Sequence, residues 1–149
     1  CGQAQIALRY YEEVFEDSKL GEVSYYLEGE AQSDLAIVSY AELQVGGVDL
    51  VLMDNAMGGD NTFTEALSFI VLCEDQEEID YYWAQLSHDP EAEQCGWLKD
   101  PFGVSWQIVP TCLGDYMKGP VEAVNRVTQA FLAMKKFDIS ALEKAYKGE

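Results

Sequence analysis

The stretch that decides the fold reads CGWLKDPFGVSWQIVP, residues 95–110, and has the pattern of two strands closed by a turn. Asp100-Pro101-Phe102-Gly103 predicts a type I turn, because proline pre-sets φ at the second position and Asp and Gly suit the first and fourth. Side chains on the second arm must alternate between the two faces of a sheet. One face is then bulky and apolar, which suits packing under a helix. The other carries Ser105 and Gln107, which suits a cavity wall.

The residues before this stretch predict the elements that pair with it. Glu65 to Cys73 reads as a strand, and Asp75 to Leu86 reads as a helix with acidic residues in its first turn. The same alternation then divides both strands into two faces. The face expected to line a cavity holds Ala66, Ser68, Ile70, Ser105 and Gln107. The face expected to pack against helices holds Phe69, Val71, Trp106 and Ile108.

The N-terminal part of the chain predicts one helix and three strands. The helix spans Gln3 to Phe15, and strands are expected at Glu22–Glu28, Leu35–Val45 and Val48–Asp54, the last two joined as a hairpin at Gly46-Gly47. The helix is expected to bury the face formed by Ile6, Tyr10, Tyr11, Val14 and Phe15. The element order is therefore α-β-β-β, followed by β-α-β-β in the second half.

The C-terminal part predicts helices. Pro120 to Met134 has apolar residues at helical spacing, with proline suited to the first turn, and Asp138 or Ser140 can cap a second helix. At 149 residues we expect one domain, 1–149. Its parts are a first module 1–61, a second module 62–112 and a helical tail 113–149.

Four blocks of sequence, in order, resemble the PhnB-like branch (3-demethylubiquinone-9 3-methyltransferase-like) of the glyoxalase/bleomycin-resistance/dioxygenase superfamily, also called the vicinal-oxygen-chelate fold. The blocks are Gly2–Phe15, Phe63–Phe69, Cys73–Glu78 and residues 95–110. The resemblance implies an α+β fold of two βαβββ modules whose curled mixed sheet surrounds a cavity, followed here by the C-terminal helices. It places the opening strand of the first module just before Gly2, upstream of the sequence given, and it implies a homodimer.

Enzymes of this superfamily hold a divalent metal with His, Glu or Gln side chains from the strands. The usual His position corresponds to Ala66, and the Glu of the closing strand corresponds to Gln107. We therefore expect no metal and no cofactor, although Gln107 and Asp54 would hold a divalent metal if one binds. The predicted ligand cavity comprises Asp54, Ala66, Ser68, Ile70, Ser105 and Gln107.

Other catalytic motifs are missing from the sequence. There is no nucleophile elbow, P-loop or dinucleotide fingerprint, so the methyltransferase name has no recognisable cofactor-binding loop behind it. The loop 55–61 is a candidate lid, and His88 reads as a surface loop residue. Asp54 and Glu65 could form a paired-carboxylate site, but acids at strand ends are usually solvated. Trp97 and Trp106 are expected in the core, with an aromatic cavity wall as the alternative.

The net charge is −18, and residues 1–98 alone carry 21 acids against two bases. Such a surface disfavours nucleic acid and anionic membranes, which bind through Lys and Arg clusters. It serves either solubility or the attraction of a cationic ligand. The four cysteines show no C-x-x-C spacing, and no signal peptide or membrane span is recognisable, which fits a cytoplasmic protein.

Two functional classes follow. The first is a dimeric, metal-free protein that binds or sequesters a small molecule. The alternative is a divalent-metal-dependent lyase or dioxygenase of the vicinal-oxygen-chelate type. A structural partner without any ligand is a third, simpler class.

Overall fold

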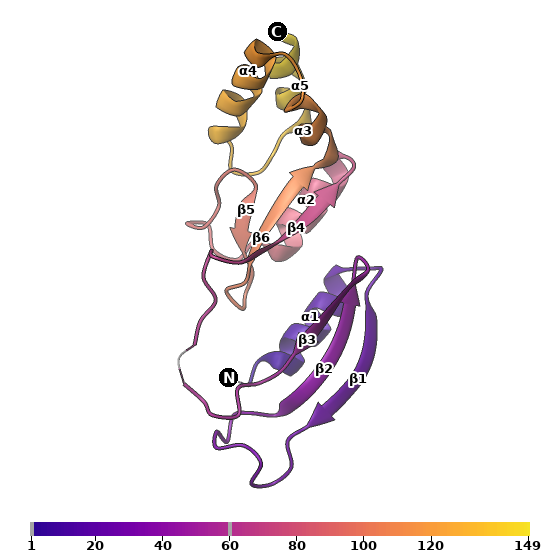
Figure 1. Cartoon of the computed structure of the whole chain (residues 1–149), viewed down its shortest axis with the longest axis vertical. Coiled ribbons are helices and arrows are strands. Elements are labelled where there is room, and N and C mark those ends of the chain that lie inside the picture. Colours follow the sequence, from indigo (N-terminus) through magenta and orange to yellow (C-terminus); the bar gives the residue numbers. More distant parts are fainter. Residues whose placement is uncertain (1, 60) are drawn as a thin grey trace. The chain divides into compact units, whose positions relative to one another are not determined.

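The computed structural model describes residues 2–59 and 61–149 and divides the chain into two compact units, Cys1–Thr62 and Phe63–Glu149 (Figure 1). The division falls one residue after the expected module boundary at 61. Cys1, and Asp60 of the candidate lid loop 55–61, lie outside the described residues. The expectation that 1–149 acts as a single domain stays a prediction, and the two units are described separately.

Unit 1 has the predicted order of one helix and three strands. Helix α1 (Ala4–Val14) is followed by strands β1 (Lys19–Tyr25), β2 (Val38–Val45) and β3 (Val48–Leu52), which form an antiparallel sheet in the order β1-β2-β3. The hairpin between β2 and β3 is confirmed, because Gly46 and Gly47 have φ of 55° and 77°, as a type I′ turn requires.

Strand β1 begins three residues before the predicted start at Glu22. Lys19 and Leu20 pair with Gln44 and Leu43, and an irregularity between Leu20 and Val23 then shifts the register. The bulge places Gly21 against Glu42, whose side chain occupies the space that a Cβ would need. A local irregularity of this kind interrupts the alternation on which the sequence prediction depends.

Helix α1 packs on the sheet of unit 1 through a stripe that includes two alanines. The buried residues at this interface are Ala4, Ala7, Leu8, Tyr11, Val14 and Phe15 on the helix side, with Ala41 and Leu43 on β2. Ile6 is 62% exposed, so its predicted place on the buried face is wrong. The buried stripe of the helix runs through Ala4, Ala7 and Tyr11, which leaves Ile6 on the exposed side.

Unit 2 has the predicted β-α-β-β order. Strand β4 (Ser68–Cys73) and helix α2 (Gln76–Leu86) precede strands β5 (Trp97–Lys99) and β6 (Ser105–Pro110), and the sheet order is β4-β6-β5. β4 and β6 are parallel, and such a pair needs a crossover element, here α2. β4 begins at Ser68 rather than Glu65, because residues 64–67 form a turn in which the Ala66 amide donates to Thr64 Oγ1.

The two faces of the unit 2 sheet follow the predicted alternation. Phe69, Trp106 and Leu98 are register neighbours on the face that packs under α2, and the Phe69 and Trp106 rings lie 5.1 Å apart. Ile79 of α2 and Ile108 of β6 are fully buried in this core. The opposite face, called the open face below, carries the rows Ser68–Ser105–Lys99 and Ile70–Gln107–Trp97.

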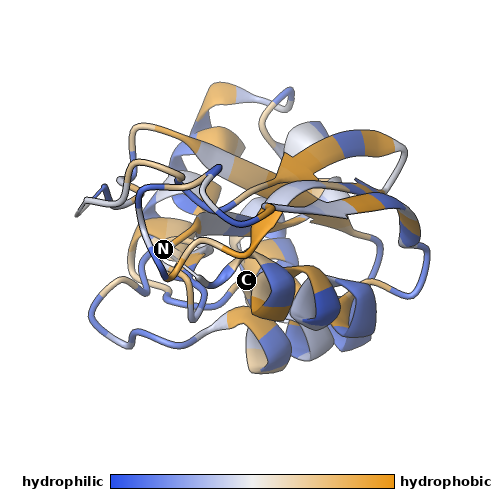
Figure 2. Cartoon of the chain, turned by 90° about the horizontal axis from the view of Figure 1, so that it is seen from below, coloured by the Kyte–Doolittle hydropathy of each residue, from blue (hydrophilic) through white to orange (hydrophobic). Residues whose placement is uncertain are grey.

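The tail contains three helices, α3 (Thr111–Tyr116), α4 (Val121–Leu132) and α5 (Ile139–Lys147). α3 was not predicted, and α4 ends two residues before the predicted Met134. Asp138 caps α5 as predicted, because its carboxylate accepts a bond from the Ala141 amide. Val127 of α4 and Leu142 of α5 are fully buried. Figure 2, coloured by hydropathy, shows that the helices in view carry both apolar and polar residues.

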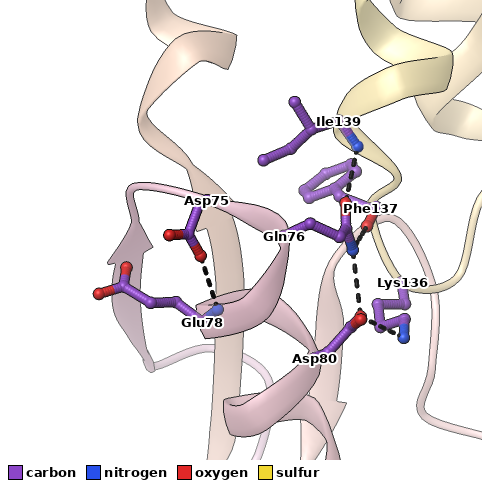
Figure 3. Close-up of polar contacts among 7 residues, drawn as sticks. All are labelled: Asp75, Gln76, Glu78, Asp80, Lys136, Phe137 and Ile139. Carbon is purple, nitrogen blue, oxygen red and sulfur yellow. Dashed lines mark hydrogen bonds and ion pairs between the residues drawn. The ribbon is translucent and has the colours of Figure 1, made fainter.

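The tail is joined to the rest of unit 2 by several hydrogen bonds, of which two sets come first. Figure 3 shows the first, in which the Gln76 side chain donates to the Phe137 carbonyl at 3.1 Å and accepts from the Ile139 amide at 2.9 Å. In the second, the Cys95 amide donates to Met134 O at 2.9 Å and the Gly96 amide donates to Lys135 O at 2.7 Å. The tail is therefore part of the folded unit.

Within residues 2–59 and 61–149, every helix is too short or too polar to cross a lipid bilayer.

Candidate functional site

A cavity of about 430 Å³ lies on unit 2 and includes part of the open face. Its walls come from β5, the start of β6, the turn before β4 and the loop between α2 and β5. The lining residues are Glu65, Ala92, Gln94, Cys95, Trp97, Leu98, Lys99 and Ser105. A hollow of this volume, open to solvent and with a mostly apolar wall, has room for a small molecule against the sheet.

Ser105 is the most unusual residue of this cavity. Its side chain is 1% exposed, and its Oγ has no hydrogen-bond partner among the described residues. A buried hydroxyl without a partner destabilises a fold by about 1–3 kcal/mol, so such a group calls for an explanation. Ser105 lies between Ser68 and Lys99 in its row of the sheet and is one of the residues that line the cavity.

Lys99 and Glu65 form an ion pair at the cavity wall. The Lys99 side chain is 25% exposed, whereas the Glu65 side chain is 62% exposed and belongs to the turn before β4. The hydrogen bond from Lys99 and its charge lower the pKa of the Glu65 carboxyl below its usual value. Among the described residues that line the cavity, Lys99 is the one cationic side chain, and its partner Glu65 is a surface carboxylate outside the sheet.

Gln107 and Ser68 are paired on the open face. The Gln107 Nε2 donates to Ser68 Oγ at 2.9 Å, across the parallel pair of β4 and β6. In its own row of the sheet, Gln107 lies between Ile70 on β4 and Trp97 on β5. Of the residues predicted for a ligand cavity, Ser68, Ile70, Ser105 and Gln107 thus share one face. Ala66 precedes the strand, in the exposed turn.

Asp54, the remaining predicted site residue, belongs to unit 1. Its carboxylate is buried and accepts hydrogen bonds from the amides of Ala4 at 3.2 Å, Ile37 at 3.1 Å and Val38 at 3.0 Å. Burial alone would raise the pKa of Asp54, but these backbone hydrogen bonds outweigh it and lower the pKa. The carboxylate joins the start of α1 to the start of β2, which is a structural task.

The residues that the resemblance places at metal positions offer few free ligand atoms within either unit. Asp54 already accepts three backbone hydrogen bonds, Ala66 has no donor atom, and Gln107 offers one amide oxygen. Within the described part of the chain, no group of three or more His, Cys, Asp or Glu side chains is arranged to hold a metal. His88 is exposed in its loop, as predicted. A stable site needs several such donors converging on one ion.

Comparison with known proteins agrees with the fold. The sequence model of a family described as 3-demethylubiquinone-9 3-methyltransferase matches residues 1–109. The chain belongs to this family. A solved structure of a PhnB protein from Bacillus cereus, described by the same activity, is 30% identical, with a TM-score of 0.62 over 74% of this chain and 92% of the other. The shared α+β fold of this PhnB-like family is thereby shown.

A protein from Staphylococcus aureus is 21% identical over 72% of this chain and 86% of its own, with a TM-score of 0.29. No curated protein matches the chain.

The family match ends at Val109, but the tail beyond Val109 forms hydrogen bonds with the loop that lines one side of the cavity. Gln94 Nε2 donates to Leu132 O at 3.0 Å, and Lys135 Nζ donates to Pro90 O at 3.0 Å. Cys95, expected within a strand, instead adopts a φ of 51° in the loop and donates its amide to Met134 O. Residues 132–135 of the tail therefore fix the position of the loop that lines the cavity.

Of the residues that line this cavity, Ser105 belongs to the predicted set and the other seven do not. Trp97 was expected in the core, but it is half-buried and lines the cavity, as the alternative allowed, whereas Trp106 is buried. Lys99 and Glu65 were not proposed together. The position of Lys99 could have been predicted from the turn, because a hairpin closed at Asp100–Gly103 places Lys99 opposite Ser105. The position of Glu65 depends on the long-range pairing of β4, which leaves no local pattern.

Proposed function

We propose that this member of the PhnB-like family binds a small organic molecule in the cavity of unit 2, without a metal ion. The observation that carries the proposal is the Ser105 hydroxyl, which is buried at the cavity wall and has no partner among the described residues. A ligand with a polar atom at that point would satisfy it, and the free energy of that hydrogen bond would then contribute to binding.

The walls of the cavity support the same proposal. Trp97 offers apolar surface, and Lys99, on the same face of β5, offers a charged donor that can orient a ligand. Binding sites for small molecules combine these two features, since apolar contact gives affinity and a few polar groups give orientation. The volume of about 430 Å³ suits a molecule of one or two rings.

The family description names a methyltransferase, but the glycine pairs of this chain do not favour a cofactor role. Gly46-Gly47 closes the hairpin between β2 and β3, with positive φ at both residues. Gly58 lies close to Ser33 in a loop of unit 1. Neither arrangement is the turn between a strand and a helix that cradles a cofactor phosphate. The proposal therefore rests on the cavity.

A thermal-shift screen of small organic molecules tests this function, with EDTA present and again with added divalent ions. We expect molecules that raise the melting temperature in EDTA, because a ligand that binds the folded chain stabilises it. The Ser105→Ala variant should respond less to the same molecules. Stabilisation that requires a divalent ion would instead support the metal-dependent lyase or dioxygenase. The absence of any stabilising molecule would contradict a binding function.

The resemblance implies a homodimer, and we propose one here as well. Ile70 and Leu72 on β4 are 58% and 65% exposed, and apolar side chains of this size on a strand favour association. Light scattering after gel filtration measures the mass directly. A mass of 16.7 kDa at micromolar concentration would contradict the dimer, and twice that mass would support it.

A further inference from the structure

We infer that the ligand of this cavity is a small planar carboxylate, which binds Lys99 and Ser105 in place of the Glu65 carboxylate. The inference rests on the proposed function and adds the chemical class of the ligand. It starts from the two polar side chains that β5 and β6 place side by side, since Lys99 and Ser105 are register partners in the antiparallel pair.

The polar groups of the cavity favour an anionic acceptor. An ammonium group has three donors and no acceptor, and a serine hydroxyl with no partner has its own hydrogen to donate. A carboxylate has two oxygens and can accept one bond from Lys99 Nζ and another from Ser105 Oγ. Hydrogen bonds between charged partners are shorter and stronger than neutral ones, so a carboxylate would gain more here than an amide or an alcohol.

The apolar wall favours a flat ligand body. Trp97 is half-buried, lines the cavity and shares a face of β5 with Lys99. Aromatic rings pack on an indole face or edge with a favourable geometry that aliphatic chains lack. A single aromatic ring that carries a carboxylate therefore matches both the wall and the two donors.

Glu65 occupies the position that we assign to the ligand's carboxylate. Its side chain is 62% exposed and comes from the turn before β4, so the sheet does not hold it in place. Its carboxylate neutralises Lys99 in the absence of ligand. Unit 2 has 15 acidic residues and seven basic ones, and this net negative charge repels an approaching anion. An anionic ligand therefore needs the positive charge of Lys99 in order to bind. Exchanging Glu65 for a ligand carboxylate leaves Lys99 neutralised before and after binding.

The inference makes opposite predictions for the two members of the ion pair. The probes are benzoate, benzamide and benzamidinium, which share one ring and differ in charge, measured by calorimetry on the full chain. We expect benzoate to bind with a Kd of about 1 mM or tighter, benzamide to bind more weakly and benzamidinium not to bind. Glu65→Gln should tighten benzoate binding several-fold, because it removes the internal competitor.

Substitution of the donors should weaken binding. Lys99→Met should weaken benzoate binding by about tenfold or more, and Ser105→Ala should weaken it severalfold. Lys118→Met and Glu122→Gln are matched controls with the same charge changes on the exposed surface, and they should leave the Kd unchanged. If Lys99→Met does not fold, Glu65→Gln and the three probes still decide the question.

Three results would overturn the inference. One is that benzoate does not bind. Another is that Glu65→Gln leaves benzoate binding unchanged or weakens it. The third is that benzamidinium binds and loses affinity in Glu65→Gln, which would identify a cation site. The proposed function can stand when this inference fails. If molecules from the thermal-shift screen bind Lys99→Met as tightly as the native chain, the cavity binds small molecules, but its ligand is not a carboxylate held by Lys99.

Discussion

The indole nitrogen of Trp106 donates a hydrogen bond of 2.9 Å to Oδ2 of Asp100, and both residues are buried. The other oxygen of Asp100 accepts from the amides of Phe102 at 2.9 Å and Val104 at 3.0 Å. The Asp100 carboxylate therefore closes the turn between β5 and β6 and fixes the Trp106 ring on the face of the sheet that packs against α2. This contact holds Ser105 and Lys99 in the register that forms the cavity wall.

Asp100→Asn should lower the free energy of unfolding by about 2 kcal/mol or more, because an amide cannot accept at both ends and its NH₂ group would meet buried donors. Asp115→Asn is the control, since that carboxylate is on the surface. Urea unfolding followed by tryptophan fluorescence measures both. Equal midpoints for the two variants would contradict the role of Asp100.

Gly96 and Gly103 form a matched pair that separates backbone strain from steric clash, since both have a φ of 82°. A Cβ on Gly96 would lie 2.5 Å from the Phe137 ring and 3.0 Å from Ile108 O, whereas a Cβ on Gly103 meets nothing within 4 Å. Gly103→Ala should destabilise by about 1–2 kcal/mol through φ alone. Gly96→Ala should destabilise further and loosen the tail. Equal losses would contradict close packing of Phe137 on Gly96, and proteolysis near residues 133–138 reports the tail.

Asp54→Asn should destabilise unit 1, because the carboxylate accepts amide bonds from α1 and β2. The pKa of Asp54 is lowered in the fold, so its contribution is complete above the usual value of 3.8 and is lost as the pH falls through the folded value. The difference in stability between the native chain and the variant should therefore shrink below about pH 4. Hydrogen exchange at Val38 measures it. Asp34→Asn, in an exposed loop, is the control, and a pH-independent difference would contradict this account.

Ser105→Ala and Ser68→Ala should have opposite effects on stability. Ser105→Ala removes a buried hydroxyl that has no partner and should raise the free energy of unfolding by about 1 kcal/mol. Ser68→Ala removes the acceptor of Gln107 and should lower it by about 1 kcal/mol. Urea unfolding of the chain without added ligand is the measurement. A loss of stability in Ser105→Ala would indicate that the hydroxyl already has a partner.

Cys73 should be the least reactive of the cysteines that the structure describes. Its burial, and secondarily the nearby Glu78 and Asp75, raise the pKa of the thiol from 9.0 to about 12. The neutral thiol is favoured in the fold, so its contribution to stability is complete below about pH 9 and is lost as the pH rises towards 12. Alkylation by iodoacetamide at pH 8, read by peptide mass, should spare Cys73 in the native chain and modify it in urea. Native-state alkylation of Cys73 at the rate of Cys95 would contradict its burial.

The sequence predicted the faces of the second sheet because polar and bulky apolar side chains alternate from Ser105 to Ile108, and this alternation separates the two faces. It predicted the turn at Asp100 from residue chemistry, but not the bond to Trp106, which forms only once the strand is in register. Helix α3 was missed because it buries no residue and contains Gly114, so no apolar spacing marks it. Asp54 was assigned to the cavity because an acid at a strand end looks the same in sequence whether it faces a ligand or binds distant amides.

The central claim is that a small molecule occupies the cavity beside Trp97 without a metal ion. Fluorine NMR of the chain labelled with 5-fluorotryptophan tests it directly, because Trp83, Trp97 and Trp106 are the three tryptophans and each gives its own signal. The strongest molecule from the thermal-shift screen is titrated in EDTA. The account predicts a saturable shift of the Trp97 signal while the buried Trp106 signal stays in place. A titration that moves no Trp97 signal, or moves it only when a divalent ion is added, would contradict the account.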